Sequence, residues 1–368
     1  MKKSHLHTTL SRLSAVVFVL LLAATALRCG DGGQQQARRA DTAEQLDEKP
    51  THRNPLFSLY YSKTDGAYMI YRNSEKIATF ALDGGRKPVQ MRSRNGDCFV
   101  LVSESRNADT TDSVGAAVRV PAEILKNGRR AMMLDNKLRA MDFDMSEGHF
   151  YVLGRLDDSV YTVYRDGLRI LSFPVKEGDK PVDMSVFQQT VYLARQRGNT
   201  VDIYEGDKKI SSLPGKCLDL KVSLRGVYLL VPDSLYLNND MVMHNEFYRY
   251  SDKEMRTNPT MLATSDKNVV VGGRAFFDRK HTYASIFLNQ QTYTTIKPDH
   301  KTIGNSDFNT LCCGVALSDE TVYYVTTNLS ANMEQTQPVS YNYYIDRNES
   351  YSIAFEKQDV RLLMIASD

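Results

Sequence analysis

The stretch from Val182 to Leu213 decides the fold, because it contains four short runs typical of β-strands, separated by polar turns. The runs are V-D-M-S-V-F (182–187), T-V-Y-L-A-R (190–195), T-V-D-I-Y (200–204) and K-K-I-S-S-L (208–213). Their Val, Ile, Tyr and Leu residues suit a pleated, half-buried surface, and the apolar side chains fall partly on alternate positions. Gly198-Asn199 and Glu205-Gly206-Asp207 tolerate the positive φ of short hairpin turns. The stretch therefore predicts a four-stranded antiparallel unit that needs neighbours to bury its faces.

Variants of this unit recur along the chain. In each variant an apolar residue closes the third strand just before a polar turn, and these residues are Tyr71, Leu125, Tyr164, Tyr204, Leu237, Leu288 and Ile345. Tyr164 and Tyr204 lie 40 residues apart, a period that suits one blade of a β-propeller. Seven such positions predict an all-β fold of seven four-stranded antiparallel blades.

The two ends of the chain predict how the ring of blades closes. The first unit lacks a first strand, because only a polar stretch precedes Phe57, and the chain ends in a spare strand, V-R-L-L-M-I-A from Val360. Placing the spare strand in the first unit completes that blade and removes an exposed sheet edge. We therefore expect the C-terminal strand to close the ring.

Residues 55–368 resemble a bacterial seven-bladed β-propeller, nearest to the YVTN-type or quinoprotein-like surface propellers. Tyr324-Val325-Thr326-Thr327-Asn328 is similar to the YVTN signature in one blade. The chain has no Trp, so the Trp-dependent motifs of WD40, kelch, quinoprotein and sialidase blades are absent. Quinone-cofactor and sialidase activities are therefore not expected. Asp-Ser/Thr triplets resemble the O-glycosylation signal of Bacteroidota secreted proteins, at Thr42, Thr110, Ser113, Ser159 and Ser234.

The N-terminus has the pattern of an exported lipoprotein. Residues 1–12 are basic and residues 13–27 almost entirely apolar, a length typical of a signal-peptide core, so we expect a signal peptide over 1–28. Ala26-Leu27-Arg28-Cys29-Gly30 resembles a lipobox, which implies lipidation of Cys29, although Arg28 and Ala26 depart from the usual pattern; without lipidation the protein would be secreted. Residues 29–54 are polar and rich in Gly and Gln, which predicts a flexible tether before a propeller domain over 55–368.

Charge excludes one class of partner. The formal charge is +2, and residues 1–28 hold four basic and no acidic side chains, so the rest of the chain carries −2. A near-neutral chain has no electrostatic footprint for nucleic acid. We expect contact with a membrane through the N-terminal lipid only, at the outer membrane, facing either the periplasm or the cell surface.

The predicted connections differ in length between the two faces of the disc. One face has short turns, and the other has long segments at 105–117, 244–259, 274–281, 297–308 and 328–340. Because function concentrates on loops held by a rigid scaffold, this second face is the expected binding face. The candidate ligand-binding residues there are Arg274, Phe277, Asp278, His281, Tyr248 and Tyr250. The competing interpretation is solvated charge and aromatic side chains packed on the disc.

Motifs for metal, cofactor or nucleophilic chemistry are absent from the sequence. The seven histidines are scattered without zinc-ligand spacing, and Asp142-Phe143-Asp144 lacks the remaining oxygens of a calcium loop. No G-x-S-x-G elbow or phosphate-cradling loop occurs, so no catalytic residue, metal or cofactor is predicted. After Cys29, the spacing of Cys98, Cys217, Cys312 and Cys313 predicts no disulfide framework, and their pairing stays open.

Three functions fit this pattern. The leading hypothesis is a lipid-anchored, non-catalytic propeller of the cell envelope that binds a glycan, a peptide or an envelope protein. The alternative is a propeller glycan hydrolase or lyase with carboxylates at the channel mouth, and the third is a platform within an envelope complex. An enzyme needs converging carboxylates with perturbed pKa values in a pocket, whereas a binding disc needs an exposed aromatic patch.

Overall fold

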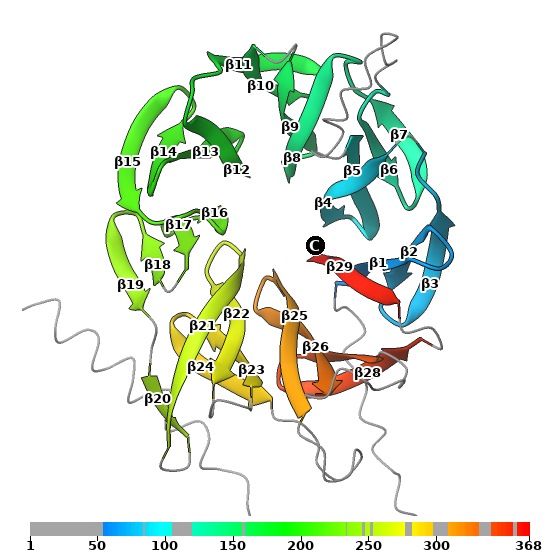
Figure 1. The fold of residues 1–368 in the computed structure, drawn as a ribbon, viewed down its shortest axis with the longest axis vertical. Coiled ribbons are helices and arrows are strands. Elements are labelled where there is room, and N and C mark those ends of the chain that lie inside the picture. The colour runs from blue at the N-terminus through cyan, green and yellow to red at the C-terminus, as the bar shows by residue number, and fades with distance from the viewer. Residues whose placement is uncertain are drawn as a thin grey trace, which may run out of the picture. The chain divides into compact units, whose positions relative to one another are not determined.

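The computed structural model describes residues 54–368 apart from 84, 105–119, 157–158, 233, 245–246, 251–252, 277–281, 297–307, 331–339 and 356–358. These residues belong to the second of two units into which the chain divides, His52–Asp368. They form antiparallel β-sheets arranged around a common centre, without helices (Figure 1). The prediction of an all-β, seven-bladed β-propeller is confirmed.

The first four blades each contain four strands, which follow one another from the innermost strand outward. Blade 1 consists of β29 (Val360–Ser367), β1 (Leu56–Ser62), β2 (Ala67–Arg72) and β3 (Glu75–Phe80). Blade 2 consists of β4 (Arg86–Arg94), β5 (Asp97–Glu104), β6 (Glu123–Lys126) and β7 (Arg129–Met133). Blade 3 consists of β8 (Leu138–Ser146), β9 (His149–Leu156), β10 (Val160–Arg165) and β11 (Leu168–Pro174). Blade 4, the stretch from which the fold was predicted, consists of β12 (Asp179–Phe187), β13 (Thr190–Arg197), β14 (Thr200–Glu205) and β15 (Lys208–Pro214).

The remaining three blades complete the ring. Blade 5 consists of β16 (Asp219–Ser223), β17 (Gly226–Val231), β18 (Ser234–Leu237) and β19 (Asp240–His244). Blade 6 has five strands, β20 (Phe247–Tyr250), β21 (Lys253–Thr264), β22 (Val269–Phe276), β23 (Thr282–Leu288) and β24 (Gln291–Ile296). Blade 7 consists of β25 (Phe308–Ser318), β26 (Thr321–Ser330), β27 (Ser340–Ile345) and β28 (Asn348–Ala354).

The ring closes as the sequence predicts. β29 pairs antiparallel with β1, from Leu56 opposite Ser367 to Ser62 opposite Val360, so one blade holds strands from both ends of the domain. Figure 1 shows β29, in red, beside the blue β1. The inner edge of β1 is therefore covered by the last strand of the chain rather than exposed.

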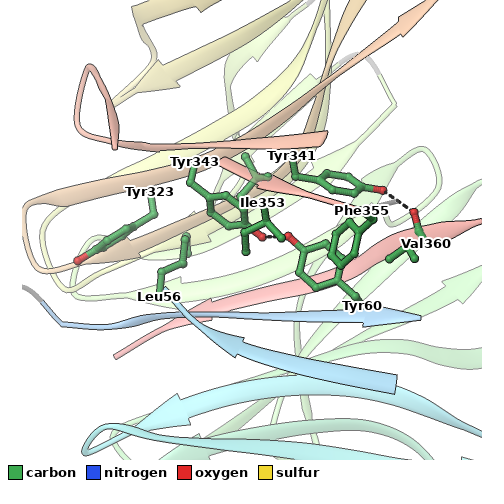
Figure 2. Close-up of a cluster of buried hydrophobic side chains, with 10 residues drawn as sticks. Leu56, Tyr60, Tyr323, Tyr341, Tyr343, Ile353, Phe355 and Val360 are labelled. Atoms are coloured by element: carbon green, nitrogen blue, oxygen red, sulfur yellow. Dashed lines mark hydrogen bonds between the residues drawn. The ribbon is translucent and has the colours of Figure 1, made fainter. Parts of the chain in front are cut away.

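Apolar packing joins every pair of neighbouring blades. The buried residues fall into seven clusters, and each cluster takes its side chains from two adjacent blades. The cluster between blades 7 and 1 is rich in tyrosine (Figure 2). There Tyr341 donates to the carbonyl of Val360 (3.3 Å), and the hydroxyls of Tyr60 and Tyr343 hydrogen-bond to each other. The hydrophobic core is thus divided into seven interfaces, and the fold depends on closing all of them.

A turn residue repeats the same contact in six blades. The first residue of the turn between the third and fourth strands has positive φ, and its side-chain oxygen accepts a hydrogen bond from the start of the second strand. In blade 2 the Cys98 N–H donates to Asn127 Oδ1 (2.9 Å), while the Asn127 N–H donates to the Cys98 carbonyl (2.8 Å). The equivalent residues elsewhere are Asn73, Asp166, Asn238, Asn289 and Asp346. Asn and Asp tolerate this backbone conformation, which explains the polar turn after each predicted third strand.

Blade 4 lacks this contact, and restoring it should stabilise the protein. Gly206 stands at the equivalent position with φ of 59° and open space around it, and its N–H donates to the Val191 carbonyl. We expect Gly206→Asn to raise the free energy of unfolding by about 0.5–1 kcal/mol, because the new side chain can accept from the Val191 N–H. Urea unfolding measures the change. Gly206→Ala is the control and should lose about 1 kcal/mol, because alanine meets the positive φ without gaining a hydrogen bond; equal effects of the two substitutions would contradict the prediction.

Blade 6 departs from the other blades. The sequence predicted a long connector over residues 244–259, but the structure forms β20 and the first half of β21 there, paired from Phe247 opposite Arg256 to Tyr250 opposite Lys253. The prediction of an irregular connection was wrong because these residues extend the sheet as a hairpin. β20 lies beside the end of β21 farther from the centre of the ring (Figure 1).

Candidate functional site

The innermost strands of all seven blades surround a central channel of about 700 Å³. Its walls come from β4, β8, β12, β16, β21, β25 and β29. Enclosed spaces of this size are typical of ligand sites, and scaffold strands hold their side chains more rigidly than loops do. The channel is therefore one candidate site, and the extension of blade 6 is the other.

A β-bulge recurs in the innermost strands. The pairing with the second strand shifts between Pro88 and Gln90 in β4, and equivalent shifts occur in β8, β12, β21, β25 and β29. A bulge sets one extra residue against the partner strand and re-aims the side chains beside it. The extra residues are Val89, Met141, Val182, Thr260, Cys313 and Leu363, and all of them line the channel.

Blades 2 to 5 give one side of the channel a charged lining. It contains Arg92 from β4, Asp142 and Asp144 from β8, Asp183 from β12, and Asp219 and Lys221 from β16. The facing side, from blades 6, 7 and 1, is largely apolar and includes Met261, Ala263, Val315, Leu317, Leu363 and Ile365. The channel wall therefore has two chemically different halves.

The carboxylates of the charged half join each blade to the next. Asp142 Oδ2 accepts from the Met184 N–H (2.7 Å), and Asp183 Oδ2 accepts from the Leu220 N–H (2.6 Å). Asp144 accepts from the Val186 N–H (2.7 Å) and, through its other oxygen, from Arg92 Nε (2.8 Å). Inner strands leave backbone N–H groups unpaired at the sheet edge, and these carboxylates satisfy them.

These contacts decide between two interpretations of the channel carboxylates. A glycan hydrolase or lyase needs two carboxyl groups free to exchange protons or attack substrate. Asp142, Asp144 and Asp183 instead have both oxygens bonded to backbone N–H groups or to Arg92. The geometry assigns them to joining blades, so it supports no catalytic step.

Protonation in the charged half is unequal. Withdrawal from water raises the pKa of Asp183 well above its ordinary value; Lys221 opposes this shift, and Asp142 and Asp219 add to it. Lys221 has a pKa raised above its ordinary value, because Asp219 and Asp183 outweigh the effect of its burial. The charges therefore largely neutralise one another within the wall.

The raised pKa of Asp183 predicts how stability depends on pH. The folded chain keeps this proton at pH values where the unfolded chain, with an ordinary Asp pKa of about 3.9, has lost it. The free energy of unfolding contributed by Asp183 is therefore highest below the unfolded pKa and falls as pH rises toward the folded pKa. Asp183→Asn cannot ionise, so the stability of the variant relative to the natural protein should increase from about pH 4 to about pH 7.

Urea unfolding at several pH values tests this prediction. The control is Asp240→Asn, which alters an exposed carboxylate at the start of β19. Its effect should stay nearly constant over the same pH range. An Asp183→Asn effect that is equally constant would contradict the prediction.

The residues predicted from sequence gather on blade 6 rather than in the channel. Arg274 lies on β22 with an exposed side chain, and Tyr248 and Tyr250 lie on β20. β21 pairs with both strands, so β20 and β22 are roughly 10 Å apart. Phe277, Asp278 and His281 lie outside the described residues, so their predicted role is untested.

Sequence reasoning missed the channel residues as a group. Asp142, Asp183 and Asp219 occupy equivalent places in three successive first strands. That repetition is a signal that an alignment of first strands could have found. It could not have shown that each carboxylate reaches the neighbouring blade.

The described residues add findings on metals, cysteines and membrane spans. Cys98, Cys217, Cys312 and Cys313 are all free thiols. No group of three or more His, Cys, Asp or Glu side chains in this part of the chain could hold a metal ion. Within the same residues, no helix has the length and apolar character to cross a membrane.

Comparisons with known proteins bear on the fold. No family model matches the chain, and no curated protein matches it in sequence. One similar solved structure is BBS1N in complex with ARL6DN, with 10% identity and a TM-score of 0.45, over 74% of this chain and 85% of that chain. Another is dihydro-heme d1 dehydrogenase NirN in complex with DHE, with 9% identity and a TM-score of 0.45, over 84% of this chain and 76% of that chain. At this level of similarity, neither structure assigns a ligand or an activity to this chain.

Proposed function

We propose that this protein is a non-catalytic binding propeller whose contact surface is the extension of blade 6. The observation that carries the proposal is the departure of this one sheet from the repeat. Among the sheets of the described residues, blade 6 has a fifth strand, and its β21 is 12 residues long. Six regular blades would then serve as the rigid scaffold for one modified blade.

The side chains of the extension suit recognition of a glycan or a protein. Arg274 and Phe276 are both exposed and lie two residues apart on β22, on the side opposite the buried Ala275. Phe276 pairs with Arg256 of β21, which in turn pairs with Phe247 at the start of the F-Y-R-Y strand β20. Tyr, Phe and Arg are the residues that contribute most at binding interfaces.

The N-terminal sequence supports an envelope location. Lipidation of Cys29 would hold the propeller at the outer membrane, and the polar residues 30–54 would let the disc reach partners on either the periplasmic or the exposed side. The partner would be a glycan, a peptide or another envelope protein. Incorporation of labelled palmitate into the natural chain, but not into Cys29→Ser, tests the anchor.

Binding of the purified full-length protein to a glycan array and to envelope extracts tests the contact surface. The test variant is Arg274→Ala with Phe276→Ala. The matched control is Arg169→Ala with Leu168→Ala, which removes an exposed basic and an exposed apolar residue from blade 3. Selective binding that is lost in the first variant and kept in the second supports the proposal. Binding that both pairs reduce equally, or that neither pair affects, overturns it.

Variants at Phe277 and His281 extend the same test to the segment that follows β22. Loss of the same partner in Phe277→Ala or His281→Ala would support the residues predicted from sequence. Unchanged binding in both would restrict the contact surface to the paired strands.

A further inference from the structure

One position in every blade brings a side chain into the channel. The six bulge residues have a seventh equivalent in Leu218, which precedes β16 and whose N–H donates to the Leu230 carbonyl. We call these seven residues the collar: Val89, Met141, Val182, Leu218, Thr260, Cys313 and Leu363. Six of the seven are apolar, although they line a cavity rather than the packed interfaces between blades.

Two collar residues are exposed to an extent unusual for leucine. Leu218 is 46% exposed and Leu363 is 41% exposed, and both side chains line the channel. The apolar half of the wall continues from Leu363 through Met364, Ile365, Val315 and Met261. A cavity with this lining gains free energy when an apolar group replaces its water.

The charged half of the wall does not call for a charged ligand. Arg92 pairs with Asp144, Lys221 pairs with Asp219, and Asp142 and Asp183 accept backbone N–H groups. Placing a further charge in the channel would have to break one of these contacts or desolvate the ligand without a partner. A neutral ligand avoids both costs.

We propose that the channel binds a neutral, elongated apolar ligand of the alkyl-chain class, gripped by the collar. The lining runs over residues 260–266 in blade 6, roughly 20 Å of extended chain, which suits a long ligand rather than a compact one. The volume of about 700 Å³ lies within the range of small-molecule sites. This inference concerns a different site from the blade 6 extension and does not depend on it.

Fluorescence of N-phenyl-1-naphthylamine, a neutral apolar dye, tests the proposal with the full-length protein. We expect saturable binding of one dye per chain and competition by dodecanol. The variant Leu218→Ser with Leu363→Ser should weaken binding at least about tenfold, because two leucine contacts are lost. Thermal unfolding confirms that each variant is folded before binding is measured.

Two further variants separate the channel from apolar surface elsewhere. Leu218→Trp should also weaken binding, because the larger side chain fills the channel while making the protein more apolar. Leu168→Ser should leave binding unchanged, because this leucine is 73% exposed on the outer strand β11 and lies outside the channel lining.

The outcomes are distinguishable. Weaker binding in the serine pair and in Leu218→Trp, with unchanged binding in Leu168→Ser, supports a ligand in the channel. Absence of saturable dye binding overturns the proposal. Equal loss in Leu168→Ser, or stronger binding in Leu218→Trp, also overturns it, because either result places the dye on general apolar surface.

Discussion

A chain that ends at residue 359 is expected to lose cooperative folding. The truncation removes β29, the innermost strand of blade 1, and exposes the edge of β1 along its whole length. It also removes Val360 and Ala366, two buried residues that belong to the clusters on either side of blade 1. Both interfaces of one blade are therefore opened by a single deletion.

The size of the effect follows from the narrow margin of protein stability. Folded domains are stable by about 5–15 kcal/mol in total, and the deletion removes a full strand pairing together with core contacts in two interfaces. We expect the broad, non-cooperative melting of an unfolded or partly folded chain in circular dichroism, and a larger hydrodynamic size in gel filtration. A sharp melting transition close to that of the natural chain would contradict the closing role of β29.

Two controls make this result specific to the strand. Arg361→Ala alters an exposed side chain of β29 and should change stability by less than about 0.5 kcal/mol. A synthetic peptide of residues 360–368 should restore a cooperative transition to the truncated chain, because β-strand addition can occur between separate chains. Failure of the peptide to bind the truncated chain would show that the truncated ring does not keep its vacant edge.

The second large effect is expected at Asp179, the first residue of β12. Arg195 binds its carboxylate through two atoms, Nε to Oδ1 (3.0 Å) and Nη2 to Oδ2 (2.7 Å), and both side chains are nearly buried. The Arg195 guanidinium also lies between the rings of Phe173 and Tyr204, at 4.6 and 4.7 Å from their centroids. Asp179→Ala should lower the free energy of unfolding by about 3–5 kcal/mol, because it leaves the buried guanidinium without its counter-charge.

Urea unfolding of four proteins in a double-mutant cycle tests this expectation. The set is the natural chain, Asp179→Ala, Arg195→Met and the double variant, whose loss should be smaller than the sum of the two single losses. Asp240→Ala serves as a control at an exposed carboxylate and should change stability by less than about 0.5 kcal/mol. Additive losses in the cycle would show that the pair is not coupled and would contradict the prediction.

Local sequence determined the repeated parts of this fold. Short apolar runs and their turns specify blade hairpins because side-chain alternation and positive-φ residues act over a few neighbouring positions. Gln188-Gln189 and Asn127-Gly128, for example, were predicted as short turns, and all four residues have positive φ. The unpaired first unit and the spare strand from Val360 were enough to predict closure, because each lacks a partner that the other supplies.

Only the tertiary structure decided what lines the channel and how blade 6 ends. Asp142 reaches the Met184 N–H across 42 residues of sequence, and Asp183 reaches the Leu220 N–H across 37. Such contacts depend on the angle and spacing of neighbouring sheets, which a single blade's sequence does not contain. The hairpin of β20 and β21 escaped prediction for a related reason, because F-Y-R-Y is too short to indicate a strand without the partner that pairs with it. Repetition along the chain therefore fixed the number of blades, while packing between blades set the chemistry at their centre.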